Sequence, residues 1–107
     1  MMNFVVEFEH PPNLCPHSNA LARKGFEDGV EGGVLDALAE KLGVGIVFAG
    51  IAVPLHKTYM VLSGPDYAAV RSLFVQSGIV QTNSVQIHVT ESFAEFAEEI
   101  KGSAPIF

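Results

Sequence analysis

Four stretches of the chain combine β-forming residues with the alternation of apolar and polar positions that is typical of half-buried strands. The clearest is residues 3–9, where Phe4, Val6 and Phe8 alternate with more polar neighbours. Two consecutive prolines, Pro11 and Pro12, follow it, and neither can donate a hydrogen bond to a sheet. The other three predicted strands are residues 44–53, 56–63 and 79–89.

Helical periodicity separates these strands. Between residues 19 and 42, starting after a cap at Ser18 or Asn19, every fourth residue from Phe26 to Leu42 is apolar and predicts one buried stripe. Four glycines between residues 25 and 33 weaken the first half, each by about 1 kcal/mol relative to alanine. We therefore expect a regular helix over residues 34–42, ended by Gly43, and a frayed or kinked segment before it.

Two further helices are expected. One begins at the sequence Ser-Gly-Pro-Asp (63–66), with Ser63 as its cap and Pro65 in its first turn, and Gly78 ends it. A short third helix follows Thr90 or Ser92. Its apolar residues Phe93, Phe96 and Ile100 are expected to face inward and its glutamates to face water.

The resulting order, β-α-β-β-α-β-α, matches the split βαβ arrangement. The predicted fold is therefore α+β and ferredoxin-like, with a C-terminal helix added. The sheet is expected to be antiparallel with strand order 4-1-3-2, which places the first strand between the third and the fourth. Residues 1–107 form one domain on this interpretation, with one sheet face covered by helices and the other open.

Composition narrows the possible partners. The net charge is −6 and the isoelectric point is about 5.0, which argues against a surface that follows nucleic-acid phosphates. No apolar run reaches the roughly 18–20 residues that a membrane span needs. The N-terminal residues lack the features of a signal peptide, and a single cysteine fits a reducing compartment. We expect a cytoplasmic protein that binds neither nucleic acid nor a membrane.

The predicted topology gathers metal-binding side chains at one edge of the sheet. Antiparallel pairing puts the end of strand one beside the start of strand three, so His10 and His56 should approach each other. Cys15 and His17 follow in the adjacent loop. Three imidazoles and a thiolate suit zinc, nickel or copper. The alternative is that the histidines are ordinary loop residues and the cysteine is a small buried apolar group.

A second group of candidates lies on the open face of the sheet. Glu7, Tyr59 and His88 could line a polar cavity there, with Glu7 or His88 as a general base and Tyr59 as a hydrogen-bond donor. The alternative is packing between two copies of the chain, in which Glu7 pairs with Lys57 or His88. Dimer closure would itself create such a cavity, so the two interpretations are compatible.

Two sequence patterns carry a resemblance to a known superfamily. They are A-E-K-L-G-V-G-I-V-F-A-G at residues 39–50 and H-K-T-Y-M-V-L-S-G-P-D-Y-A-A-V at residues 56–70. In these the chain resembles the dimeric α+β barrel superfamily, in particular small domains of the GYD type and nickel-binding ferredoxin-like domains. The resemblance implies a homodimer whose interior binds a small molecule, supports cofactor-free oxygenation or isomerisation, or holds a metal.

Three functional hypotheses follow. The leading one is a small homodimer that binds a transition metal or a small ligand, with His10, Cys15, His17 and His56 as the metal candidates. The second is a cofactor-independent enzyme of the small monooxygenase or isomerase type that uses Glu7, Tyr59 and His88. The third is a ligand-sensing accessory domain without catalysis. The fold does not choose among them.

Overall fold

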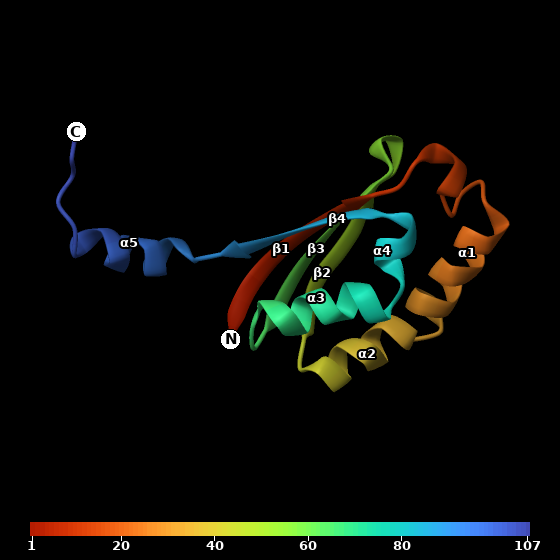
Figure 1. The fold of residues 1–107 in the computed structure, drawn as a ribbon, viewed down its shortest axis with the longest axis horizontal. Helices are drawn as coiled ribbons and strands as arrows, with labels where there is room; N and C mark the ends of the chain where they lie inside the picture. The colour runs from red at the N-terminus through yellow and green to blue at the C-terminus, as the bar shows by residue number, and fades with distance from the viewer.

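Four antiparallel strands form a single sheet in the computed structural model of the chain, which describes residues 1–107 (Figure 1). The strands are β1 (Met2–Glu9), β2 (Gly45–Ala52), β3 (Lys57–Gly64) and β4 (Ser84–Thr90). Their order is β2-β3-β1-β4, with β1 pairing to both β3 and β4. This order confirms the predicted 4-1-3-2 sheet and the α+β, ferredoxin-like class.

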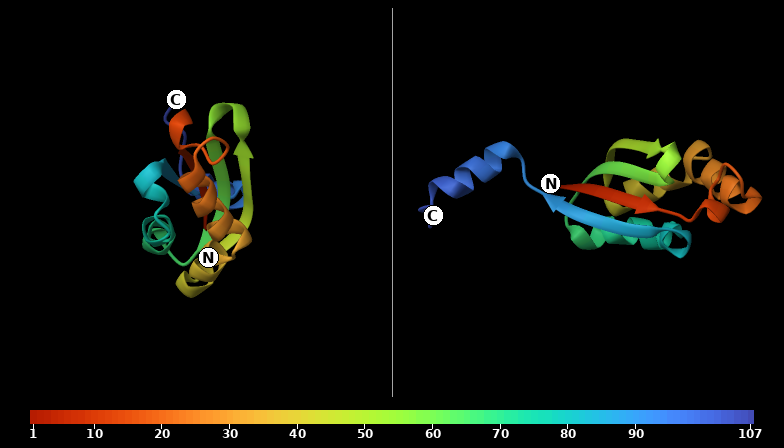
Figure 2. Two further views of the ribbon diagram at one scale, coloured as in Figure 1. Left: turned by 90° about the vertical axis from the view of Figure 1, so that its right-hand side faces the viewer. Right: turned by 90° about the horizontal axis from the view of Figure 1, so that it is seen from above.

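Helices α2 (Val34–Leu42) and α3 (Tyr67–Gln76) cover one face of this sheet. The other helices are α1 (Ala20–Phe26), α4 (Ile79–Thr82) and α5 (Phe93–Lys101), with a π-helical segment η2 (Glu27–Glu31) and two 3-10 turns, η1 (Pro12–Leu14) and η3 (Val53–Leu55). Figures 1 and 2 show α2 and α3 on the same side of the sheet. No helix combines the length and the apolar character that crossing a membrane requires.

The core lies between the sheet and these two helices. Its members are almost fully buried: Phe4, Val6, Ala39, Val44, Met60, Leu62, Val70, Leu73 and Phe74. The alternation predicted for β1 is thus confirmed, because Phe4 and Val6 face the helices while Val5 is exposed on the other side. Phe74 and Phe8 meet edge to face, with their ring centroids 5.8 Å apart.

The segment between β1 and β2 bends where the glycines lie. Helix α1 continues into the π-helical η2, and Gly33 then adopts a left-handed conformation (φ 77°) before α2 begins. The predicted continuous stripe is therefore wrong in its first half, since Phe26, Val30 and Val34 are exposed. On α2, Ala39 is buried, and Leu35, Leu38 and Leu42 pack against the core, so the stripe is confirmed at Leu38 and Leu42.

Helix α3 begins later than predicted. Strand β3 continues through Gly64, and Ser63 pairs with Asn3 in the ladder, so Ser63 cannot cap the helix. Asp66 is the cap instead, its side chain accepting a hydrogen bond from the Ala69 amide at 2.8 Å. Strand β3 approaches α3 closely at Gly64, where an added Cβ would lie 3.1 Å from Val70 Cγ2.

The fourth strand is also shorter than predicted. Residues 79–82 form the short helix α4, and β4 begins only at Ser84. Gly78, at φ 81°, allows the chain to turn directly from α3 into α4. Ile79 packs against the core from this helix. Local packing therefore overrides the β-forming tendency of residues 79–82.

The C-terminal helix stands away from the rest of the molecule. Ser92 caps α5 through a capping box with Glu95. Ser92 was one of the two caps predicted for this helix, the other being Thr90. The prediction that Phe93, Phe96 and Ile100 face inward is wrong. Phe93 is 94% exposed, and α5 extends beyond the end of β4 without covering the sheet (Figures 1 and 2). Residues 91–107, which we call the arm, have no surface of their own chain to bury against.

The arm carries a row of carboxylates that makes it sensitive to pH. A hydrogen bond that protonated Glu91 donates to the Glu99 carboxylate, and the negative charge of Glu99, raise the pKa of Glu91 above its ordinary value of 4.5, with a smaller effect from the charge of Glu95. The helical arm therefore holds this proton more tightly than the unfolded arm does. Its helix is stabilised below pH 4.5, and that stabilisation is lost as the pH rises through the raised pKa.

We therefore expect amide-exchange protection of the arm to increase as the pH is lowered from 7 toward 4.5, after correction for intrinsic exchange rates. The Glu91→Gln variant, which cannot titrate at this position, should show a flatter profile. Identical profiles for the two proteins would contradict the coupling between Glu91 and Glu99. Nuclear magnetic resonance of the whole protein provides the measurement, with β1 amides as the internal reference.

Candidate metal centre

The two central imidazoles meet where β1 ends and β3 begins. Glu9 is the last residue of β1 in the ladder and pairs with Lys57, so the next residues outward are His10 and His56. The His10 amide donates to the His56 carbonyl at 3.3 Å. Their rings lie edge to face, with centroids 5.4 Å apart. The predicted approach of His10 and His56 is therefore present.

His56 has a strained backbone. It is the one residue other than glycine with a positive φ (53°). It follows the 3-10 turn η3, and its amide donates a hydrogen bond to the Val53 carbonyl of that turn. A left-handed conformation is unfavourable for most side chains, although histidine adopts it more often than many. The tight turn from β2 into β3 imposes it, and the same turn holds His56 beside β1.

Cys15 sits in a loop with a well-defined backbone. Its amide donates to the Pro12 carbonyl at 3.3 Å, closing the 3-10 turn η1. Its own carbonyl accepts from the amides of Ser18 and Asn19, at 3.0 and 2.8 Å. The cysteine is partly buried and forms no disulfide. These hydrogen bonds hold the thiol near the end of β1.

Helix α1 fixes the same loop from its other side. The Arg23 guanidinium donates to the carbonyls of Pro16 and His17, at 3.0 and 2.7 Å. Asn19 caps α1 by accepting from the Ala22 amide, and its side-chain NH₂ donates to the Asn13 carbonyl at 3.1 Å. The Cys15 loop is thus hydrogen-bonded to α1, and Asn19, the cap of this helix, is one of the two predicted caps.

Three of the four predicted metal candidates come together. One donor atom each from His10, Cys15 and His56 lies within 4.8 Å of the others. His17 is not in this group; its side chain is exposed and its backbone carbonyl is bound to Arg23. The Nε2 atom of His10 and the Nδ1 atom of His56 are buried and have no hydrogen-bond partner.

Asn83 orients one of these imidazoles, and sequence reasoning missed it. His10 Nδ1 lies 3.3 Å from Asn83 Oδ1. The Asn83 side-chain NH₂ donates to the Ile79 carbonyl and to Thr82 Oγ1, both at 3.1 Å, so its oxygen is the atom directed at His10. Nδ1 must then carry the proton, which leaves the Nε2 lone pair free to bind a metal. The predicted strand order could have identified Asn83. Glu9 pairs with Ser84 across the β1–β4 ladder, and this pairing places Asn83 beside His10.

The spacing of the donors suits a metal after a small movement. At zinc bond lengths of about 2.0–2.1 Å to nitrogen and 2.3 Å to sulfur, tetrahedral ligand atoms lie about 3.4–3.6 Å apart. The present separations of up to 4.8 Å exceed this by roughly 1 Å, so the donors must approach one another by about that amount to bind an ion. The residues therefore fit a borderline metal ion.

A hollow of about 380 Å³ opens beside the three donors. Phe26, Ile51 and Val53 supply apolar walls, and Glu27 and Glu31 add carboxylates from the π-helical segment η2. Segments of π-helix are rare and occur often at functional sites. The hollow gives a small molecule access to the cluster.

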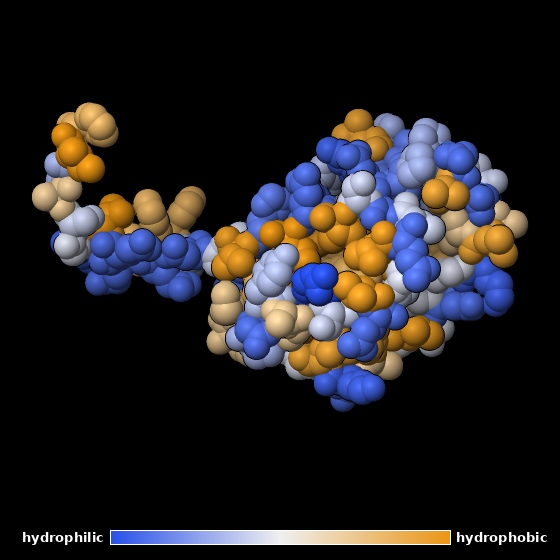
Figure 3. Space-filling model, in the orientation of Figure 1, coloured by the Kyte–Doolittle hydropathy of each residue, from blue (hydrophilic) through white to orange (hydrophobic).

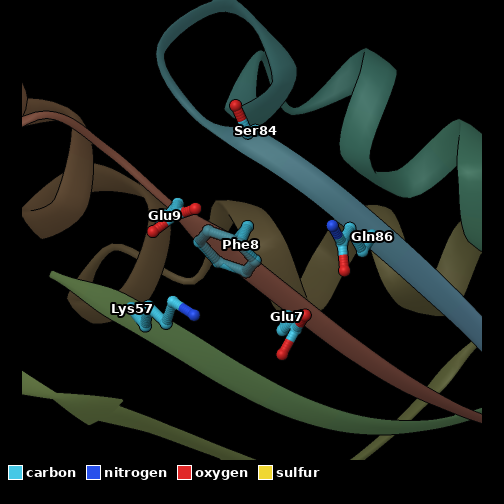
Figure 4. Close-up of a pocket in the computed structure, with 6 residues that line it drawn as sticks. All are labelled: Glu7, Phe8, Glu9, Lys57, Ser84 and Gln86. Atoms are coloured by element: carbon cyan, nitrogen blue, oxygen red, sulfur yellow. The ribbon is translucent and has the colours of Figure 1, made fainter. Parts of the chain in front are cut away.

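The open sheet face holds the second set of candidates. Glu7 pairs with Tyr59 on one side and Gln86 on the other, and His88 Nε2 lies 4.0 Å from Glu7 Oε1. Figure 4 shows Glu7, Lys57 and Gln86 on three neighbouring strands around a shallow hollow of about 60 Å³. The His88 side chain is 54% exposed, so the group is open to solvent. Its catalytic role stays a prediction.

Comparisons with known proteins add no assignment: no protein-family model matches the chain, and no curated protein matches it.

Proposed function

We propose that the protein binds one transition-metal ion through His10 Nε2, Cys15 Sγ and His56 Nδ1. The observation that carries this proposal is a pair of buried imidazole nitrogens without partners, on two histidines whose donor atoms lie within 4.8 Å of each other and of a thiol. A buried polar atom left unsatisfied costs about 1–3 kcal/mol. A metal ion would satisfy both nitrogens at once, and the thiolate would neutralise part of its charge.

The donor set favours zinc, nickel or copper over magnesium or calcium. Imidazole and thiolate are the ligands of borderline and soft ions, whereas magnesium and calcium prefer oxygen. Three protein ligands also leave one tetrahedral position free, as in catalytic zinc sites. A bound metal would therefore be open to water or to a small molecule from the adjoining hollow, whose lining includes Glu27 and Glu31.

Elemental analysis of the purified, untagged protein tests the proposal. We expect about one metal ion per chain in the native protein and a loss of most of it in Cys15→Ser and in His56→Ala. The His17→Ala variant is the matched control, because His17 belongs to the same loop but not to the cluster. It should retain the metal. An unchanged metal content in Cys15→Ser would overturn the proposal.

The remaining functional hypotheses stay predictions. A cofactor-independent enzyme on the open face is supported by the proximity of Glu7 and His88. The ligand-sensing hypothesis has no residue of its own to test. Membership of the dimeric α+β barrel superfamily is supported by the strand order, and the homodimer and the cytoplasmic location are proposals that follow from the sequence.

A further inference from the structure

The hollow beside the candidate metal centre has apolar walls and a size suited to a small molecule. The walls come from three separate segments: Phe26 at the end of α1, Ile51 on β2 and Val53 in η3. The volume of about 380 Å³ lies within the roughly 300–1,000 Å³ of small-molecule sites. Such sites combine apolar walls with a few polar groups, so the polar groups of this hollow decide which ligand it takes.

Two of these polar groups are carboxylates of the π-helical segment η2. Glu27 and Glu31 both line the hollow, and they lie four positions apart, on the same side of a helical segment. The Gly32 amide donates to the Glu27 carbonyl at 2.9 Å, which closes the π-helical turn that carries both glutamates. A hydrogen-bonded turn therefore presents two carboxylates to one hollow.

Neither of these carboxylates has a partner in the chain. No ion pair and no side-chain hydrogen bond involves Glu27 or Glu31. Asp28 of the same segment, by contrast, pairs with Lys24 at 3.0 Å. Figure 3 shows apolar and hydrophilic residues side by side at the α1 end of the surface, and the hollow combines the two kinds in its lining. Two negative charges beside apolar walls thus remain without a counter-charge.

Arg23 does not supply that counter-charge. It is the one lysine or arginine in the lining, and its guanidinium donates to the carbonyls of Pro16 and His17, at 3.0 and 2.7 Å. It forms no ion pair with Glu27, although the two residues are only four positions apart. The hollow therefore favours a positively charged ligand, in a chain whose net charge is −6.

We propose that the hollow binds a small organic cation that carries an ammonium group on an apolar body. The ammonium group pairs with Glu27 and Glu31, and the body packs against Phe26, Ile51 and Val53. This ligand class deepens the proposed function, because the metal donors line the same hollow. Only the contact of the ligand with a bound metal rests on that function, since neither glutamate is among the metal donors.

Each part of the hollow excludes a class of ligand. An anion would lie close to two carboxylates, and like charges brought together at a binding site cost free energy. A cation without an apolar body would leave the walls of the hollow in contact with water. An ammonium group on an apolar body satisfies both parts. Its ion pairs also gain strength beside apolar walls, because the effective dielectric constant is lower there than in water.

Three probes that share one hydrocarbon chain test this preference: hexylamine, hexanol and hexanoate. They are titrated into the full-length protein after treatment with a chelator, because a metal would itself attract the amine and the carboxylate. We expect hexylamine to bind at least about 5-fold more tightly than hexanol, as two partly exposed ion pairs allow, and hexanoate to bind least. Nuclear magnetic resonance should show the largest amide shifts at Phe26, Ile51 and Val53. Equal affinities for hexylamine and hexanol, or shifts confined to other residues, would overturn the proposal.

The Glu27→Gln/Glu31→Gln variant removes the two charges and keeps the size of both side chains. It should bind hexylamine and hexanol with similar affinity. Asp36→Asn/Glu40→Gln is the matched control, because it removes the same charge from α2, outside the lining of the hollow. It should keep the preference for hexylamine. If Glu27→Gln/Glu31→Gln keeps that preference as well, the two carboxylates do not bind the cation.

Metal analysis separates the binding of the cation from the proposed function. Neither glutamate belongs to the donor cluster, so Glu27→Gln/Glu31→Gln should contain as much metal as the native protein. A loss of metal from this variant would mean that the carboxylates bind the metal, and the proposed cation site would be wrong. If Cys15→Ser keeps its metal, the proposed function fails, and the titration of the chelator-treated protein still decides whether the hollow binds a cation.

Discussion

Asn83→Ala is expected to lower metal affinity about 10–100-fold, although Asn83 touches no metal. Its carboxamide oxygen is the partner of His10 Nδ1, and without it the imidazole can rotate or exchange tautomers, so that the Nε2 lone pair is no longer held available for a metal. Calorimetric titration of the metal-free protein with zinc measures the change in metal affinity.

Asn83→Asp is the matched control for this experiment. A carboxylate keeps the acceptor for His10 Nδ1 but loses the NH₂ that donates to the Ile79 carbonyl and to Thr82. Both variants should therefore lose some stability, whereas only Asn83→Ala should lose metal affinity. Equal affinities for the two variants would show that Asn83 acts on folding and does not orient His10.

Phe74→Ala is expected to destabilise the fold by about 3–5 kcal/mol. Phe74 is completely buried on α3 and meets Phe8 of β1 edge to face, so its removal leaves a cavity between the helix and the central strand. A domain of this size is stable by about 5–15 kcal/mol in total, and the variant should be close to unfolded. Urea denaturation followed by circular dichroism gives the free energy of unfolding.

The neighbouring substitution Val75→Ala calibrates this result. Val75 belongs to the same helix but is 44% exposed, so its truncation should change the free energy of unfolding by no more than about 0.5 kcal/mol. A cost below about 1 kcal/mol for Phe74→Ala would mean that the core closes around the cavity, which well-packed interiors rarely allow.

Local patterns predicted the four strands, and the sequence of elements predicted their order in the sheet, which the structure confirms. Alternation along β1 identifies Phe4 and Val6 as core residues because side chains of a strand point to its two faces in turn. Antiparallel pairing then places His10 next to His56, since residues beyond paired strand ends must be neighbours. Half of the candidate metal centre follows from these two periodic rules.

Other features depend on contacts between distant residues. The sequence of residues 79–82 favours a strand, but packing of Ile79 on the core makes it helical. The predicted stripe from Phe26 to Leu42 is interrupted because Gly33 turns the chain. Asn83 becomes the partner of His10 across 73 positions, and no local pattern marks it.

The sequence by itself determined the four strands, because side chains alternate between the two faces of a strand. The central position of β1 and the approach of His10 to His56 followed from the order of the elements, which matches the split βαβ arrangement. Only the tertiary structure decided that Cys15 joins this pair while His17 does not, and that α5 leaves its own core. The loop is shaped by hydrogen bonds to η1 and α1, and the arm by the direction in which β4 ends. Such directions arise from three-dimensional packing, which hydrophobic periodicity along the chain does not encode.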